Sequence, residues 1–329
     1  MMTICPIGCA TMRTNTLALL LLWLSLTGSY AGWKSSLLWV NVAGWGLLLA
    51  WMIGQAAKRP LGRVETAMML FITAMLASTL ITGTGFAAVG RIAIWFAYLG
   101  FYYLGSQWTD EEIHRAAALA LLPYPLFVFL PWENPNVIAF NFVGLTLLAR
   151  PILHWKIYIP LFVWLAWPLN SVGGILAALV TTVRLNLISA SALASILFLG
   201  AWFNPVGCAY RLQFWAEAWQ NFLLFPIWGI GPGNYHLAGW WHAHNIIATT
   251  AAETGLIGLA GLGLLVWSIA RRWLALPAWA AAVVLAYGAW SLVDEPLHFW
   301  GAAFIFFLAL SRRKDSNDGL EVSKSQMEV

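Results

Sequence analysis

Long apolar runs follow one another along almost the whole chain, and each is bounded by charges, prolines or glycines. A helix needs about 20 apolar residues to cross a bilayer core of roughly 30 Å, and most of these runs approach that length. Of the 329 residues, 61% are hydrophobic and only 9% are charged, whereas a soluble domain carries about a quarter charged residues. The runs are continuous, which excludes the short alternating segments of a membrane β-barrel. The sequence therefore predicts an all-α polytopic membrane protein.

The apolar runs predict about eleven or twelve transmembrane helices. Two of them, 156–169 and 171–183, are short and could instead form one broken or re-entrant element, so the count depends on this pair. The run at 16–31 could pass for a cleaved signal peptide, but its removal leaves an odd number of spans and an external N-terminus, which favours an uncleaved helix. The predicted spans are 16–31, 36–54, 64–82, 86–106, 113–131, 136–150, 156–169, 171–183, 186–203, 246–269, 275–292 and 297–311.

The positive charges favour one orientation of these spans. With a cytoplasmic N-terminus, the external loops keep only Lys34 and Arg211, and nearly all other cations fall on the cytoplasmic side. The net charge of +4 therefore serves topology and does not indicate a nucleic-acid partner. The predicted organisation is a bundle of about nine spans (1–203), a long external loop (204–245), about three further spans (246–311) and a disordered cytoplasmic tail (312–329).

The external loop begins with a predicted amphipathic helix, "RLQFWAEAWQNFLLFP", from Arg211 to Pro226. Polar side chains recur in it at helical spacing, and aromatic side chains such as Trp215 suit a membrane interface. One interpretation is a membrane anchor in which Arg211 binds lipid phosphates. The other is a helix that contributes to a substrate site, and the segment alone leaves both open.

Next in the loop comes "GIGPGNY", Gly229 to Tyr235, which predicts a tight turn. Glycine adopts backbone angles closed to other residues, so Gly231 and Gly233 would let the amides here and at Asn234 face a ligand. Such a turn could bind an anion, although most turns of this kind bind nothing.

A polar face opens the helix predicted to begin near residue 246. Asn245, Thr249 and Glu253 recur every four residues and so share one helical face, with His244 at the helix start beside its exposed amides. A carboxylate two turns into an apolar span is costly unless it meets a partner or water. Glu253 is therefore either a functional residue or a group that fixes a neighbouring helix. Together with His244, the functional interpretation is favoured.

Other ionisable residues fall near the same predicted surface. Arg91 lies about two turns inside its span, where it either snorkels outward or makes a cationic site at membrane depth. Asp294 belongs to the last external turn, "LVDEPLHFW", for which a solvated turn with a helix cap is favoured over a catalytic role. His242 and His244 are separated by one residue, and neither they nor the three cysteines have the spacing of a metal site.

These groups together predict a water-accessible external cavity. Guanidinium groups match phosphate oxygens bidentately, and an imidazole can give or take a proton near neutral pH. The combination suits a lipid-linked phosphate substrate better than ion conduction. The chain has no phosphate-cradling GxxxxGK[ST] loop, and the sequence predicts neither a metal nor another cofactor.

The order of the motifs resembles that of the O-antigen ligase and O-antigen polymerase family of bacterial inner-membrane proteins. The pattern is R-x3-W, G-x-G-x-G-N-Y, H-N and E-T-G-L-x-G, and the likeness is greatest over about 204–262. The twelve-span layout and "ENPNVIAF", residues 133–140, extend it more loosely. The residues that carry the resemblance are Arg211, Trp215, Gly229, Gly231, Gly233, Asn234, Tyr235, His244, Asn245, Glu253, Thr254, Gly255, Leu256 and Gly258.

The resemblance implies a metal-independent glycosyltransferase in the bacterial inner membrane with a periplasmic active site. The implied donor is an undecaprenyl-diphosphate-linked glycan, and the implied acceptor is a hydroxyl of a glycolipid, a glycan or a protein. Arg211 and Arg91 would bind the diphosphate. His244 would activate the acceptor hydroxyl or assist the diphosphate, and Glu253 would orient His244 or support its helix start.

One departure from the family pattern concerns a cation that often follows a serine ahead of a small-residue helix. The corresponding segment here is "LNSVGGILAAL", in which Val172 follows Ser171. Two other classes of protein stay open. A transporter or flippase of lipid-linked sugars would share a basic cavity but should show internal repeats and charges in both leaflets. A non-catalytic envelope-assembly protein would explain Val172 but not the ordered set from His244 to Glu253.

Overall fold

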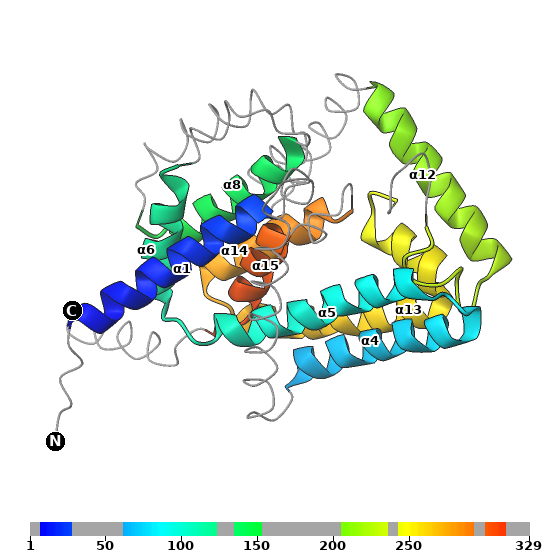
Figure 1. The fold of residues 1–329 in the computed structure, drawn as a ribbon, viewed down its shortest axis with the longest axis horizontal. Coiled ribbons are helices and arrows are strands. Elements are labelled where there is room, and N and C mark those ends of the chain that lie inside the picture. The colour runs from blue at the N-terminus through cyan, green and yellow to red at the C-terminus, as the bar shows by residue number, and fades with distance from the viewer. Residues whose placement is uncertain are drawn as a thin grey trace, which may run out of the picture.

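The computed structural model describes residues 7–27, 62–123, 135–152, 205–235, 243–292 and 300–313, and this part of the chain consists of helices without a β-strand (Figure 1). The predicted spans 36–54, 156–169, 171–183 and 186–203 lie outside the described residues. The helices are α1 (Ile7–Thr27), α4 (Arg63–Thr82), α5 (Phe86–Gly105), α6 (Asp110–Leu121), α8 (Pro135–Ala149), α12 (Pro205–Leu224), α13 (Ile246–Arg272), the 3-10 helix η1 (Trp273–Ala275), α14 (Ala278–Trp290) and α15 (Trp300–Leu310).

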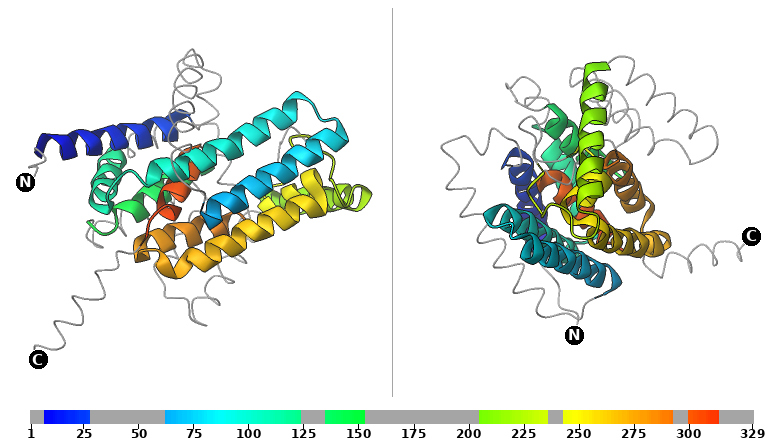
Figure 2. Two further views of the ribbon diagram at one scale, coloured as in Figure 1. Left: turned by 90° about the horizontal axis from the view of Figure 1, so that it is seen from below. Right: turned by 90° about the vertical axis from the view of Figure 1, so that its right-hand side faces the viewer.

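Three long helices, α4, α5 and α13, lie side by side (Figures 1 and 2). The first ends at Gly83, whose left-handed φ of 66° lets its amide donate to the Thr79 carbonyl at 3.0 Å and turns the chain back into α5. Helix α13 packs closely on α4 because Gly261 has no side chain. A Cβ at Gly261 would lie only 3.0 Å from the Cα of Phe71. Small residues at a helix contact are typical of membrane proteins.

Two helical stretches in the described part are long and apolar enough to cross a membrane. They are Arg63–Thr82, with a mean hydropathy of 1.8, and Ile246–Ala275, with a mean hydropathy of 1.6. The apolar helices Ala278–Trp290 and Gly301–Leu310 are shorter. The all-α class predicted from the sequence is confirmed for the described residues. The total number of spans, and the side of the membrane on which the loop 204–245 lies, stay predictions.

In a second group of helices, α1, α8 and α14 pack on α15, and α6 packs on α1 and α8 (Figure 1). Helix α15 also contacts α5, through aromatic side chains. Tyr98 of α5 stacks on Phe307 with ring centroids 5.1 Å apart, and Phe101 meets Phe304 edge-on at 5.2 Å. All four rings are buried. One continuous core therefore joins the two groups of helices.

The start of α6 explains why this helix begins at Asp110 and not at residue 113, as predicted from the apolar run. Thr109 and Glu112 form a reciprocal capping box, in which the Glu112 amide donates to Thr109 Oγ1 at 3.2 Å and the Thr109 amide donates to Glu112 Oε2 at 2.8 Å. Asp110 accepts a hydrogen bond from Arg312 Nε at 2.6 Å. Helix α1 begins at Ile7, before the predicted span at 16–31. The apolar run shows only part of this helix, because helical structure also includes the less apolar residues that precede the run.

The predicted amphipathic helix of the external loop is α12, which begins at Pro205, six residues before the predicted start. Proline suits the first helical position because its missing N–H needs no partner there. Phe214 and Ala218 are buried, and α12 packs on α13, across one end of the three-helix layer (Figure 1). Leu212 and Trp219 are exposed. An exposed apolar face is what a helix lying in a membrane interface requires.

Candidate functional site

Helix α13 is broken at Gly255, which has a φ of 60° and a ψ of −153°. The amides of the next two residues cannot complete the regular helical ladder and take partners from a distant turn instead. Leu256 donates to the Pro226 carbonyl at 2.8 Å, and Ile257 donates to the Ile227 carbonyl at 3.4 Å. The break is thus fixed by a segment almost 30 residues earlier in the chain.

The carbonyls left open by this break are taken up by the same turn. Ala252 accepts from the Ile230 amide and Glu253 accepts from the Gly231 amide, both at 2.9 Å. Four backbone hydrogen bonds therefore join residues 226–231 to the broken part of α13. Because buried backbone groups must be paired, the turn and the break depend on each other.

Two glycines make this close approach possible. A Cβ at Gly229 would overlap the backbone of Glu253, and a Cβ at Gly255 would lie 2.5 Å from the Ile227 carbonyl carbon. Ser78 of α4 secures the junction from the other side. Its hydroxyl lies 2.6 Å from the Trp228 carbonyl oxygen and 3.3 Å from the Glu253 carbonyl oxygen.

The sequence predicted that the glycine turn offers free amides to a ligand. In the structure, several of these amides are occupied by hydrogen bonds to the backbone. The amides of Gly229, Ile230 and Gly231 all donate to backbone carbonyls. Asn234 closes the turn with its amide on the Gly231 carbonyl at 3.2 Å and its side chain on the Ile230 carbonyl at 2.9 Å. Gly231 and Gly233 have φ values of 94° and 77°, which explains the glycines. The turn braces the helix break.

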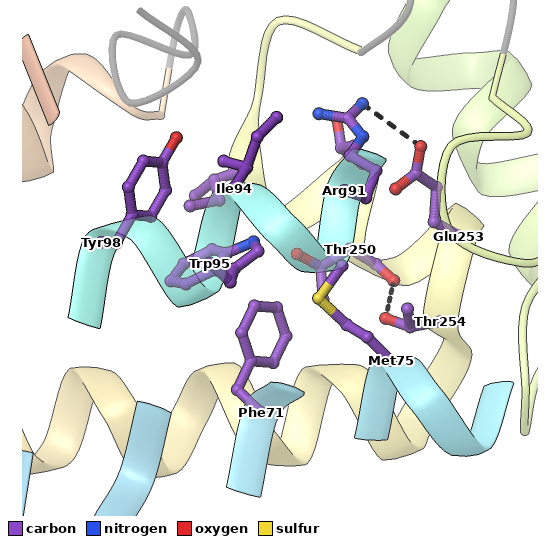
Figure 3. A pocket seen from close by; sticks show the side chains of 11 residues that line it. Phe71, Met75, Arg91, Ile94, Trp95, Tyr98, Thr250, Glu253 and Thr254 are labelled. Atoms are coloured by element: carbon purple, nitrogen blue, oxygen red, sulfur yellow. Dashed lines mark hydrogen bonds and ion pairs between the residues drawn. The ribbon is translucent and has the colours of Figure 1, made fainter. Parts of the chain in front are cut away.

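Just before the break, the Glu253 side chain forms a buried ion pair with Arg91 (Figure 3). Arg91 Nη2 lies 3.3 Å from Glu253 Oε1, and the two side chains are 11% and 5% exposed. Arg91 stands in the second turn of α5, and Glu253 stands two turns into α13. Each of these charges would be costly alone in an apolar setting, and the pairing offsets that cost.

A small cavity of about 50 Å³ adjoins the ion pair, between α4, α5 and α13 (Figure 3). One end carries the charged pair and the threonine hydroxyls, and the other is aromatic. Phe71 and Trp95 meet there edge-on, with ring centroids 4.6 Å apart. Its lining residues are Phe71, Met75, Arg91, Ile94, Trp95, Tyr98, Ile246, Thr249, Thr250, Glu253 and Thr254.

Asn245 is the N-cap of α13. Its Oδ1 accepts from the Ile247 amide at 2.9 Å and the Ala248 amide at 3.0 Å, and its Nδ2 donates to the Leu292 carbonyl at 2.9 Å. The sequence predicted exposed amides beside His244 at this helix start. Two of those amides are occupied by the Asn245 side chain, so the helix end has less capacity to bind an anion than expected.

His244 has a φ of 54°, a left-handed conformation that is uncommon for residues other than glycine, although histidine, asparagine and aspartate adopt it more often than the others do. Its side chain is buried, and its ring lies 5.4 Å from that of Phe214 on α12, tilted by 30°. A residue held in a strained conformation by its surroundings is a candidate for function. The contact with Phe214 sets the imidazole between α12 and the start of α13.

Arg211 lies on α12 three residues before Phe214, and its exposure is intermediate. Positions three apart are neighbours on a helix surface. Arg211 therefore lies about one helical turn from Phe214, the residue whose ring contacts His244. Neither Arg211 nor His244 lines the cavity beside Arg91. Trp215 is partly buried, and its Nε1 has no hydrogen-bond partner within the described residues.

His242 and Asp294 lie outside the described residues, as do Ser171 and Val172. Of the remaining predicted site residues, the structure brings Arg91 and Glu253 into direct contact and places the glycine turn against the Glu253 backbone, whereas Asn245 caps the same helix two turns earlier. Sequence reasoning missed Ser78, because a serine inside an apolar helix is a common hydrogen-bonding residue of membrane helices and gives no local signal.

A second, larger cavity of about 710 Å³ lies at the other end of the same three helices, where α4 begins and α5 and α13 end. Four arginines line it: Arg63, Arg271, Arg272 and Arg313. On α5, Arg91 lines the smaller cavity and Tyr102 lines the larger one. A rise of ~1.5 Å per residue places these two residues about 16 Å apart along the helix axis.

The chain matches no protein-family model and no curated protein.

Proposed function

We propose that this chain is a membrane-embedded glycosyltransferase of the O-antigen ligase and polymerase kind, acting at the periplasmic face of a bacterial inner membrane. Its donor is an undecaprenyl-diphosphate-linked glycan, and its acceptor is a hydroxyl of a glycolipid, a glycan or a protein. The observation that carries the proposal is the buried ion pair of Arg91 and Glu253 at the break in α13. The ordered motifs from Arg211 to Gly258 give it a chemical context.

In the proposed reaction, the acceptor oxygen attacks the anomeric carbon of the donor sugar. A new C–O bond forms, the bond from that carbon to the diphosphate oxygen breaks, and its electron pair stays on the departing undecaprenyl diphosphate. The acceptor proton passes to a base. Because the energy for transfer is stored in the phosphate–sugar bond, the proposed reaction uses neither a nucleotide nor a cofactor.

Arg91 is proposed to bind the diphosphate. A guanidinium has five N–H donors in a planar fork that matches phosphate oxygens, and its Nη2 contacts Glu253. Glu253 is proposed to position Arg91: it fixes the guanidinium in a defined plane and compensates its charge until donor binds. Negative charge grows on the diphosphate as the sugar leaves, and a fixed guanidinium stabilises that charge most in the transition state.

His244 is the proposed base or diphosphate-assisting group, and Arg211 is the proposed second phosphate ligand. Phe214 supports both assignments, because its ring contacts that of His244 and it lies three residues after Arg211 on α12. Trp215 is adjacent. In this proposal α12 lies in the membrane interface and carries Arg211 to the head group of a lipid donor.

The test is deletion of the gene in the source bacterium, followed by analysis of surface glycans and lipid-linked intermediates. We expect undecaprenyl-linked donor to accumulate on the periplasmic leaflet. Plasmid-borne Arg211→Ala and His244→Ala should insert normally and fail to rescue. Arg115→Ala is the matched control, since Arg115 is an exposed arginine of α6 paired with Glu111. Full rescue by both Arg211→Ala and His244→Ala would exclude the catalytic assignment.

A transporter of lipid-linked sugars is the second candidate. The observation that favours it is the pair of arginine-containing cavities along α4, α5 and α13. A transporter would leave the donor on the cytoplasmic leaflet in the deletion strain, whereas the transferase would leave it on the periplasmic leaflet. The leaflet in which donor accumulates therefore separates the two functions.

A further inference from the structure

The larger cavity has the size and the shape of a ligand site. Its volume of about 710 Å³ falls within the range of roughly 300–1,000 Å³ that is common for small-molecule pockets. It is bordered by the ends of four helices, α4, α5, α13 and α15, which are far apart in the sequence. We propose that it binds the phosphate head group of an anionic phospholipid, from the leaflet opposite the glycan-transfer site.

The charge of the lining selects an anion. Arg63, Arg271, Arg272 and Arg313 line the cavity, and Glu65 is the acidic residue among the described lining residues. Arginine pairs with phosphate through two parallel N–H donors and keeps its charge at any relevant pH. Hydroxyl groups can add neutral hydrogen bonds, and Tyr102, Tyr103 and Ser268 line the cavity. The hydroxyls of Ser106 and Ser311 also line it, but they donate to the Tyr103 and Leu308 carbonyls.

Arg272 is held in this lining by backbone and aromatic contacts. Its Nη2 donates to the Ser311 carbonyl at 3.1 Å and to the Arg312 carbonyl at 3.2 Å, and its Cζ lies 5.5 Å from the centre of the Tyr102 ring. Its Nε is buried and has no hydrogen-bond partner among the described residues. A buried N–H without an acceptor is unfavourable, and a phosphate oxygen would satisfy it.

The start of α4 contributes a second anion-binding feature. Its N-cap is Gly62, which has no side chain to satisfy the first amides, and Gly62, Arg63, Val64 and Glu65 all line the cavity. Exposed amides at a helix start attract anions. The Glu65 carboxylate folds back toward this start, since a Cβ at Gly62 would lie 2.6 Å from its Oε2. The Glu65 carboxylate therefore occupies the position that a phosphate would take at the start of α4, and the two anions would compete for it.

The surroundings favour a lipid over a soluble phosphate as the source of the anion. Arg271 lies over the Trp267 ring, with Cζ 5.8 Å from its centre, and Trp267 is an exposed aromatic residue near the end of α13. Leu274 is 90% exposed close by. Tryptophan and arginine at the end of an apolar helix are typical of the head-group region of a bilayer. Basic pockets between helices on the cytoplasmic side bind anionic lipid head groups.

The test is native mass spectrometry of the full-length protein in neutral detergent, titrated with phosphatidylglycerol or phosphatidylcholine. We expect one tightly retained phosphatidylglycerol and no comparable phosphatidylcholine. Arg271→Gln and Arg272→Gln should each weaken binding about fivefold, the factor for one arginine near a lipid surface. Glu65→Gln should strengthen it, and Arg115→Gln, on an exposed face of α6, should leave it unchanged.

Three outcomes overturn the proposal. Equal retention of phosphatidylcholine excludes a charge-selective site. Unchanged binding in the Arg271→Gln protein excludes this cavity, and the result does not depend on Arg272, whose loss could disturb the end of α15. Displacement of the lipid by an equal concentration of inorganic phosphate identifies a soluble anion as the ligand. The inference needs only that these helices lie in a membrane, so its failure leaves the proposed glycan transfer untouched.

Discussion

The Arg91 guanidinium and the Glu253 carboxylate face each other across the gap between α5 and α13, with Nη2 and Oε1 3.3 Å apart (Figure 3). The two residues are separated by 162 positions in the sequence. Their pairing lies immediately before Gly255, where α13 leaves helical geometry. A buried ion pair therefore lies beside a break in a helix backbone, and functional sites tend to be found at such places.

Removing one partner of this pair should destabilise the protein more than removing both. A buried charge left without its partner costs about 3–5 kcal/mol, whereas an apolar replacement of the whole pair can be nearly neutral. We expect Arg91→Met and Glu253→Leu each to lower the midpoint of thermal unfolding in detergent, and the double variant to recover most of the loss. Additive losses in the double variant would contradict an energetic coupling between the two side chains.

Gly255→Ala should disrupt the site severely. Alanine is strained at the φ of this position, and its Cβ would lie 2.5 Å from the Ile227 carbonyl carbon, so the turn at 226–231 must move. The matched control is Gly263→Ala on the same helix, where a Cβ meets nothing within 4 Å. This control should be neutral or stabilising by up to about 1 kcal/mol, because alanine favours helix. Equal stability of the two variants in thermal unfolding would show that the break does not need glycine.

The three-helix layer could be predicted from the sequence because its signals are local. The apolar runs at 64–82 and 86–106 predict α4 and α5 to within one residue at each end, since Gly83 and Gly85 separate them. Polar residues at a spacing of four also predicted that Thr249 and Glu253 share one face of their helix, and both line the cavity beside Arg91. Such signals are carried by neighbours along the chain and need no tertiary contact.

The break in α13 and the role of the glycine turn could not be predicted in the same way. The sequence around Gly255 is compatible with a continuous helix, and the hydrogen bonds that hold it open come from Pro226 and Ile227. The amides of the turn were expected to be free for a ligand, but Gly231 donates to Glu253 instead. Partners distant in the sequence decide both features.

Loss of the Asn245 cap should weaken the start of α13 selectively. Asn245→Ala removes two accepted hydrogen bonds and should cost about 1 kcal/mol, while Asn245→Asp keeps them. Thr109→Ala removes the cap of α6 and should cost a similar amount. Because α6 lies outside the site, only Asn245→Ala should also reduce glycan transfer, measured as rescue of surface glycan in the deletion strain. Equal loss of transfer in both variants would point to stability alone.

His244 allows chemistry and backbone strain to be separated. Its φ of 54° favours glycine and is well tolerated by asparagine. We expect His244→Gly and His244→Asn to keep or raise the midpoint of thermal unfolding relative to His244→Ala. None of the three should support transfer, because each lacks the imidazole. Transfer by the asparagine variant at the wild-type rate would remove His244 from the mechanism.

In the proposed reaction, the lipid diphosphate binds at Arg91 and Arg211. The decisive measurement is a titration of the purified full-length protein with undecaprenyl diphosphate, the leaving group of the proposed reaction, which gives the dissociation constant. We expect at least about tenfold weaker binding for Arg91→Gln and for Arg211→Gln, the scale of a lost charge-assisted contact to phosphate, with no change for Arg272→Gln in the other cavity. Wild-type affinity in both the Arg91→Gln and Arg211→Gln proteins would contradict this binding site.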